Sequence, residues 1–257
     1  MKGKVYSVFF SPTGSSKRIA EHFSCVLAKA LGTEQDFIDL TRRENRGKAH
    51  EFSKCDIVVA AFPVYGGRVP PVCRPSFELL KGSGFAVPLA VYGNRHYDDA
   101  LLEMGDLLSK NGFNVTAGAA LIAEHSMTSL VGTGRPNSDD LNEISDFAEK
   151  CAEKIKDGAD TSPVFPGNNP YKELKGGSPV YPVTNDSCVK CGACASVCPM
   201  GIIASDGTVK GEGCIRCAAC VKTCPVSAKS FTDEGALKIK AFLEQNCANP
   251  RPNEYYI

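Results

Sequence analysis

Short apolar runs alternate with segments of helical periodicity over the first 158 residues of the chain. One run, Ile57–Phe62, is apolar throughout, as expected of a central strand that is buried on both faces. Regular alternation of strands and helices is typical of a parallel sheet that is covered by helices on both sides. The predicted strands are Val5–Phe10, Phe37–Leu40, Ile57–Phe62, Phe85–Tyr92 and Val115–Ala123.

The segments between these runs place apolar residues three or four positions apart, which predicts helices with one buried face. Ser138 is the expected N-cap of one of them, because acidic residues follow it in the first turn. The predicted helices are Lys17–Leu31, a helix that begins after Pro71 and ends within Phe77–Lys81, Asp98–Asn111, Asp139–Lys156 and Gly235–Asn246.

The texture of the chain changes after residue 158. Residues 159–183 are rich in proline and glycine, which predicts a linker or a segment that wraps around the preceding domain. From residue 184 onward the chain becomes rich in cysteine. The predicted organisation is therefore an α/β domain over 1–158, a linker over 159–183 and a small C-terminal domain over 184–257.

Composition excludes some functions. The formal net charge of the 257 residues is zero, and no basic cluster stands out, so we expect no nucleic acid as a partner. The apolar run near the N-terminus is too short for a signal peptide, and no run reaches the length that spans a bilayer. We therefore expect a cytoplasmic protein without a membrane partner, in which its thirteen cysteines indicate metal binding more than disulfides.

Eight of the cysteines form two matching runs, CVKCGACASVCP and CIRCAACVKTCP. Each run has the spacing C-x2-C-x2-C-x3-C-P, which is the run of bacterial ferredoxins and predicts two [4Fe–4S] clusters. The fourth cysteine of such a run binds the other cluster, so the predicted ligation is crossed. One cluster is expected on Cys188, Cys191, Cys194 and Cys224, and the other on Cys214, Cys217, Cys220 and Cys198.

Structural zinc is the alternative for eight cysteines, since zinc also accepts four thiolates. Zinc ribbons, however, use two separated C-x2-C pairs for each ion and have no need of four clustered cysteines followed by proline. The spacing therefore favours iron and sulfide over zinc.

A hydroxyl-rich loop follows the first predicted strand. Ser11-Pro12-Thr13-Gly14-Ser15-Ser16 leads directly into the first predicted helix. Hydroxyls, free backbone amides and a helix N-terminus together suit a phosphate group. The chain lacks the G-x-x-x-x-G-K-[ST] loop of NTPases and the G-x-G-x-x-G loop of dinucleotide-binding domains.

Two further loops at the ends of predicted strands combine glycines with tyrosines. These are the segment around Tyr65-Gly66-Gly67 and the segment from Tyr92 to Asp99. With the loop Ser11–Ser16, they make the first 158 residues resemble the flavodoxin family, whose S/T-x-T-G-x-S/T loop holds the FMN phosphate. The resemblance implies a doubly wound, five-stranded parallel sheet with strand order 2-1-3-4-5.

The same resemblance implies the FMN site. The expected phosphate-binding residues are Ser11, Thr13, Gly14, Ser15 and Ser16. The expected ring-lining residues are Tyr65, Gly66, Gly67, Tyr92, Gly93, Asn94, Arg95 and Tyr97. Flavodoxins often stack the ring on tryptophan, but this chain has none, so a tyrosine would have to serve. As a whole, the chain resembles the flavodoxin–ferredoxin fusion proteins of anaerobic bacteria and archaea, with a small α+β dicluster ferredoxin domain at the C-terminus.

Two functions follow from this resemblance. In the first, the protein is an electron carrier that couples FMN to two [4Fe–4S] clusters and exchanges electrons with redox partner proteins. In the second, FMN acts on a small-molecule substrate and the clusters only supply electrons. The second function needs a proton donor beside the ring, for which His96 and His125 are the candidates.

Overall fold

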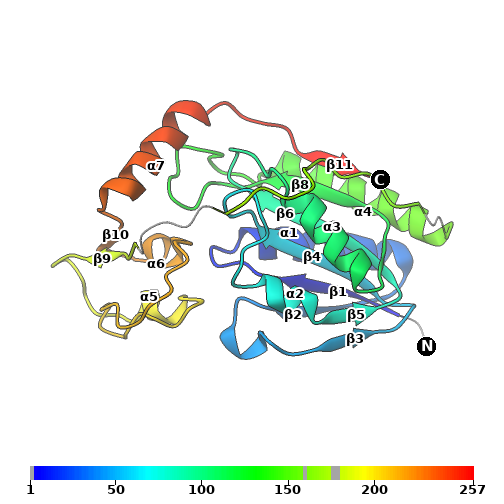
Figure 1. Ribbon diagram of the computed structural model, residues 1–257, viewed down its shortest axis with the longest axis horizontal. Helices are drawn as coiled ribbons and strands as arrows, with labels where there is room; N and C mark the ends of the chain where they lie inside the picture. The colour runs from blue at the N-terminus through cyan, green and yellow to red at the C-terminus, as the bar shows by residue number, and fades with distance from the viewer. Residues whose placement is uncertain (1–2, 159–160, 175–179) are drawn as a thin grey trace.

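The structure is a computed structural model that describes residues 3–158, 161–174 and 180–257. A large α/β unit and a small cysteine-rich unit lie side by side, and α7 (Glu234–Asn246) rises above the small unit in Figure 1. Among the described residues, no helix is both long and apolar enough to cross a membrane.

The large sheet confirms the predicted strand order. Its parallel strands lie in the order β2-β1-β4-β6-β8, which is 2-1-3-4-5 when only these five are numbered. Two short strands are added: β7, which pairs with β6, and antiparallel β11, which pairs with β8 at the edge. The bounds are β1 Lys4–Phe9, β2 Glu34–Asp39, β4 Ile57–Pro63, β6 Phe85–Tyr92, β7 Asn114–Val115, β8 Gly118–Ile122 and β11 Glu254–Tyr256.

The predicted fifth strand, Val115–Ala123, is divided into β7 and β8. Phe85 of β6 pairs with Asn114, whereas Leu89 pairs with Ala119, so the offset grows from 29 to 30 residues. One extra residue on one strand is a bulge, and the ladder is interrupted there. The apolar pattern continues through the bulge, which is why the sequence showed a single strand.

The other elements complete the layers and the small unit. The helices of the large unit are α1 Ser15–Leu31, α2 Arg74–Glu78, α3 Ala100–Lys110 and α4 Ser138–Lys156, with a 3-10 turn at Arg43–Asn45. A separate parallel pair joins β3 His50–Phe52 to β5 Leu80–Gly82. The small unit holds α5 Ala193–Ser196, α6 Ala219–Lys222 and the antiparallel pair β9 Val183–Thr184 and β10 Lys229–Ser230.

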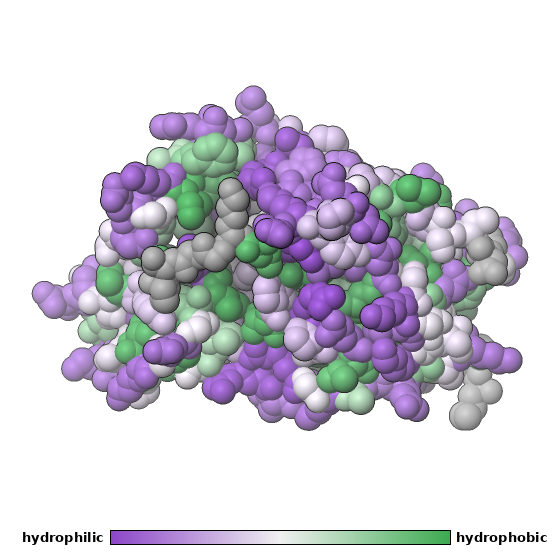
Figure 2. Space-filling view, viewed as in Figure 1, coloured by the Kyte–Doolittle hydropathy of each residue, from purple (hydrophilic) through white to green (hydrophobic). Residues whose placement is uncertain are grey.

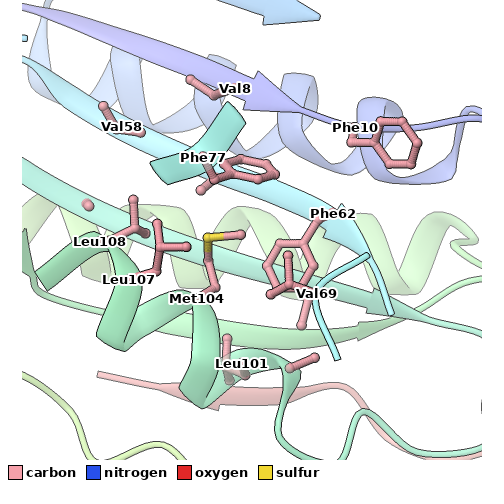
Figure 3. Packing of buried hydrophobic residues seen from close by; sticks show 14 of the residues in the cluster. Val8, Phe10, Val58, Phe62, Val69, Phe77, Leu101, Met104, Leu107 and Leu108 are labelled. Carbon is pink, nitrogen blue, oxygen red and sulfur yellow. The ribbon is translucent and has the colours of Figure 1, made fainter. Parts of the chain in front are cut away.

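The central strand β4 explains how the sheet is buried on both faces. Val58, Ala60 and Phe62 belong to one core cluster, which contains side chains of α2 and α3. Ile57, Val59 and Ala61 belong to a second cluster, with side chains of α1 and α4. Figure 3 shows the first cluster, in which Phe62 and Phe77 pack near Met104 of α3. Alternate residues of the run therefore serve opposite layers.

Several predicted boundaries were wrong, each for a local reason. Asn137, not Ser138, caps α4: its side chain accepts from the Asp140 backbone amide, and Asp140 accepts from the Asn137 amide in a capping box. The predicted helix reaching Lys81 ends at Glu78, and Leu80–Gly82 forms β5 instead. Strand β2 begins at Glu34, three residues earlier than predicted, because its first residues are polar and exposed.

Part of the predicted linker, 161–174, packs onto the large unit. The Phe165 ring covers Gly105 of α3 and Gly118 of β8, where an added Cβ would lie 2.6 Å from ring atoms. The backbone amides of Asn168 and Lys172 donate to the Asp99 carboxylate at 2.8 and 2.6 Å. The described part of the segment is therefore a strap across α3, in keeping with the wrapping alternative.

The C-terminal tail returns from α7 to the large sheet, as Figure 1 shows. The buried side chain of Asn94 holds this tail: it donates to the carbonyl oxygens of Cys247 (2.7 Å) and Asn249 (2.8 Å) and accepts from the Arg251 amide (2.9 Å). Asn94 has a φ of +58°, a left-handed conformation that asparagine tolerates better than most residues. Residues 254–256, which the sequence assigned to the C-terminal domain, thus pair with the N-terminal sheet.

Replacing Asn94 with Ala is expected to release the tail. The change removes three hydrogen bonds of a buried side chain and puts alanine at positive φ, which together cost about 3 kcal/mol. Hydrogen exchange should become faster in Glu254–Tyr256 and stay slow in β4. Asn246→Ala is the matched control, because among the described residues that exposed side chain bonds only to Phe242 within α7. Unchanged exchange in the tail of Asn94→Ala would contradict this role.

Candidate functional site

The eight clustered cysteines line two separate cavities of the small unit. The first cavity is lined by Cys188, Cys191, Cys194 and Cys224. The second is lined by Cys198, Cys214, Cys217 and Cys220. Each cavity therefore takes three thiols from one run and the fourth from the other, which is the arrangement that the ferredoxin spacing predicts.

Repeated backbone geometry brings the thiols around each cavity. Lys190 and Arg216, each two residues after the first cysteine of a run, have φ values of +56° and +54°. Gly192 and Ala218, each one residue after the second cysteine, have φ values of +76° and +59°. Positive φ is uncommon for residues other than glycine and gathers at functional sites. The two cysteine runs therefore repeat each other in backbone conformation as well as in sequence.

Backbone amides point at the sulfur atoms of both runs. The Lys190 amide lies 3.4 Å from Cys188 Sγ, and the Ala228 amide lies 3.1 Å from Cys224 Sγ. Burial alone would raise the pKa of Cys224, but hydrogen bonds from backbone amides, including that of Ala228, lower it overall. Such donors stabilise thiolates, the form that binds iron.

Two buried thiols of the second cysteine run have a pKa that is shifted in the opposite direction. Burial raises the pKa of Cys217 to about 12 and that of Cys220 to about 11. Bound metal deprotonates such thiols through its own positive charge. Four thiols around a cavity, with amides directed at sulfur, fit a [4Fe–4S] cluster. Among the described residues, no three or more His, Cys, Asp or Glu side chains are grouped to hold a single metal ion.

The two cavities differ in their surroundings, and we call them the outer and the inner cavity. The outer cavity, lined by Cys188, has exposed neighbours: Cys191 is exposed, and Val189 keeps 62% of its surface accessible. The inner cavity, lined by Cys198, adjoins the large unit, because Ile215 beside it packs against the core cluster of α2 and α3.

Contacts between the units come from loops that follow strands of the large sheet. After β2, Arg46 donates to the carbonyl oxygen of Pro199, and after β8, Glu124 forms a 2.8 Å ion pair with Lys222. After β4, burial, followed by the charges of Cys217, Cys73 and Cys214 as thiolates, raises the pKa of Tyr65 well above its usual value. The small unit therefore sits at the carboxyl edge of the sheet, where open α/β sheets bind ligands.

The loop Ser11–Ser16 lies at this same edge, between β1 and α1. The Ser11 hydroxyl accepts from the Lys17 amide at 2.9 Å, and the Ser11 amide donates to the Thr41 hydroxyl at 2.8 Å. Gly14 has a φ of +89°, and no atom lies within 4 Å of the position of a Cβ there. The loop therefore leaves open space in front of the helix.

The rest of the loop has unused donors. In the described part of the chain, the hydroxyls of Thr13, Ser15 and Ser16 bond to no other residue. The first turn of α1 contains no acidic residue, and its first amides have no partner earlier in the helix. A hydroxyl-rich, acid-free start of a 17-residue helix fits an anion such as a phosphate monoester.

The loop after β4 places its glycines where side chains would collide. An added Cβ on Gly67 would lie 2.1 Å from the Asp98 carboxylate, and one on Gly66 would lie 3.0 Å from Leu174. Arg68, which follows these glycines, is bound to the buried carboxylate of Glu103 at 2.7 and 2.9 Å.

The loop after β6 contacts the C-terminal tail with several of the predicted ring-lining residues. The Tyr97 hydroxyl bonds to Glu254 and to Tyr256, both at 2.7 Å, and the Tyr97 ring packs edge-on against Tyr92. Arg95 forms a 2.5 Å ion pair with Asp98. Together with the Asn94 contacts, these bonds give the loop a structural role; its contact with a flavin ring stays a prediction.

The two candidate histidines have different surroundings. The His96 ring stacks on Tyr97, and its Nδ1 accepts from the Asp98 amide at 2.8 Å. His125 packs against Gly93, and its Nδ1 accepts from the Met127 amide at 3.1 Å. Burial, then the charges of Lys222 and Arg95, lowers the pKa of His125 to about 4, so this ring is neutral at pH 7.

A larger cavity lies apart from the thiols, between the tail, the loop before α4 and the start of α4. Asn94 is the one predicted ring-lining residue among those that line it. Its other lining residues include Arg135, Asp140, Arg251 and Asn253, and Arg135 and Asn253 both bond to the Asp140 carboxylate. The polar groups of this cavity thus largely satisfy one another.

Comparison with known proteins agrees with the cysteine analysis. Residues 181–204 match a family described as 4Fe-4S binding domain, and residues 211–227 match a second family with the same description. A search of curated proteins finds no match.

Similar solved structures cover about three fifths of the chain. A flavodoxin from Streptococcus pneumonia TIGR4 is 18% identical, covers 59% of this chain and 99% of its own, and has a TM-score of 0.42. An archaeal flavodoxin is 15% identical over 60% of this chain and 99% of its own, with a TM-score of 0.38. An NAD(P)H:quinone oxidoreductase from Methanothermobacter marburgensis is 14% identical over 61% and 98%, with a TM-score of 0.40.

The strand order describes the N-terminal part of the chain, and the family matches describe its cysteine-rich part. The order 2-1-3-4-5 is that of the flavodoxin fold, and both cysteine runs fall within or beside the matched 4Fe-4S segments. The chain therefore joins a flavodoxin-like domain to two 4Fe-4S binding segments, as in a flavodoxin–ferredoxin fusion, and has an electron-transfer or redox role.

Proposed function

We propose that this protein is an electron-transfer protein that couples FMN to two [4Fe–4S] clusters on one chain. The observation that carries the proposal is the packing of the inner cavity against the large unit. Ile215, which lines the inner cavity beside Cys214, packs against the core cluster that includes Phe62 and Val69. These two residues flank the loop that carries Tyr65, Gly66 and Gly67, which is predicted to line the flavin ring. A ring held by that loop would therefore lie on the side of the large unit that packs against the inner cavity.

The two cavities differ in how accessible they are to partner proteins. The inner cavity is covered by the large unit through Ile215, whereas the outer cavity has exposed Cys191 and Val189 at its rim. Redox partner proteins would therefore exchange electrons at the outer cavity. The crossed cysteines Cys198 and Cys224 link the two cavities through the backbone of each run.

The residues of the large unit would bind and orient the flavin. The amides and hydroxyls of the loop Ser11–Ser16 would hold the phosphate, and Tyr65, Gly66 and Gly67 would lie along the ring. When bound, FMN supplies an exchange of one or two electrons, whereas each cluster supplies an exchange of one. The two kinds of group together would convert between two-electron and one-electron transfers.

A role as an enzyme on a small substrate receives less support from the site. A neutral His125 with a pKa of about 4 is a poor proton donor at pH 7, and His96 is held by Tyr97 and Asp98. We also propose a cytoplasmic location, because all thirteen cysteines are free thiols and clusters need reduced thiols.

Rapid mixing of oxidised, fully loaded protein with a one-electron reductant under anaerobic conditions tests the coupling. Absorbance should show the clusters reduced first and the flavin afterwards, at a rate that does not change with protein concentration. Cys198→Ser, which lacks a ligand of the inner cavity, should slow the flavin step selectively. A flavin rate proportional to protein concentration, or one unaffected by Cys198→Ser, would contradict the proposal.

A further inference from the structure

The side chain of Arg46 reaches from the large unit to the inner cavity. It leaves the loop after β2, donates through Nη2 to the Pro199 carbonyl oxygen and approaches Met200 Sδ to 3.9 Å through Nη1. Pro199 directly follows Cys198, and Pro199 and Met200 both line the inner cavity. A guanidinium group therefore lies against the segment that supplies the crossed thiol.

One donor of this guanidinium lacks a partner. Arg46 Nε is buried and makes no hydrogen bond to any described residue. Burial and the charge of Arg43 lower the pKa of Arg46, whereas Cys73 and Cys198 as thiolates raise it, but an arginine stays charged in proteins. Leaving a charged N–H buried without an acceptor is costly, so the site is suited to a neighbouring anion.

A second arginine of the same turn adds positive charge. An added Cβ on Gly201 would lie 2.2 Å from Arg43 Nη1, so the Arg43 side chain packs directly on Gly201. Arg43 and Arg46 thus both contact the stretch that follows Cys198. No arginine lines the outer cavity; among its described lining residues, the cations are exposed Lys190 and buried Lys229, whose charge acts on Cys214 and Cys220 as well as on Cys224.

We propose that Arg46 raises the reduction potential of the cluster in the inner cavity relative to that in the outer cavity. Reduction adds one negative charge to a cluster, and a fixed positive charge nearby stabilises the reduced form. Solvent and salt screen this half-buried guanidinium, whose Nε is fully buried, less than the exposed Lys190. Arg46 therefore favours placing an electron on the cluster that adjoins the large unit. The inference rests on the proposed cluster content.

Redox titration of anaerobically reconstituted full-length protein, followed by EPR, tests this role. In Arg46→Gln, one of the two cluster potentials should shift to a lower value while the other stays unchanged. Arg46→Lys keeps the positive charge but loses the planar guanidinium group. The reduction potential of the inner cluster in this variant should lie between its values in Arg46→Gln and in the unchanged protein. Arg43→Gln should lower the same potential by a smaller amount.

Arg42→Gln is the matched control. Arg42 belongs to the same turn, but its side chain is 69% exposed and pairs with Asp39 at 3.6 Å, so both potentials should stay unchanged. Clusters that are present in Arg46→Gln with neither potential lowered, or with both lowered equally, would overturn the inference. If Arg46→Gln binds less iron, Arg43→Gln and Arg46→Lys decide. A chain without clusters would instead refute the proposed function.

Discussion

Serine in place of Cys198 should remove one cluster and leave the other intact. Cys198 lines the inner cavity with Cys214, Cys217 and Cys220, although it belongs to the first cysteine run. Because two cubanes need about eight irons, the variant should bind about four. The EPR spectrum should then come only from the cluster in the outer cavity.

Two further variants decide whether the ligation is crossed. Cys217→Ser removes a ligand of the same cavity from the other run, and Cys191→Ser removes a ligand of the outer cavity from the same run as Cys198. The spectrum of Cys198→Ser should match that of Cys217→Ser and differ from that of Cys191→Ser. A match with Cys191→Ser would show that each run binds its own cluster.

Glutamate in place of Ser15 should abolish tight FMN binding. Ser15 is the first residue of α1 and belongs to the loop that is predicted to hold the phosphate. The change removes a hydrogen bond to a charged group and adds repulsion, a loss of about 3–4 kcal/mol, or about 100- to 1000-fold in affinity. The fold should not suffer, because an acidic side chain stabilises a helix N-terminus.

Flavin titration followed by fluorescence measures this effect. Riboflavin lacks the phosphate, so its weaker binding should be the same in Ser15→Glu and in the unchanged protein. Ser138→Glu is the control, because Ser138 is the exposed first residue of α4 and lies outside the phosphate loop. FMN that binds Ser15→Glu as tightly as the unchanged protein would exclude this loop as the phosphate site.

The sheet and its order were predictable because each strand is a local apolar run. Ile57–Phe62 needs no distant partner to be recognised as a buried strand, and the ferredoxin spacing fixes which thiols share a cavity. These features depend on periodicity and spacing within short segments, which a sequence shows directly.

Features that depend on distant pairs were not predictable. Asn94 and the tail are joined across about 150 residues, and β11 is too short to stand out as a strand. Arg46 sits in a run of charged residues that reads as an ordinary exposed loop, yet it contacts Pro199. The same holds for Arg68, because its partner Glu103 is a charged residue of α3 that is buried in the structure. In each case tertiary contact, not local pattern, sets the role of the residue.

Metal and flavin analysis of protein purified without oxygen tests the account most directly. Brown protein with about eight irons, about eight acid-labile sulfides and one FMN per chain is the expected result. Colourless protein that carries zinc in place of iron and sulfide would contradict it.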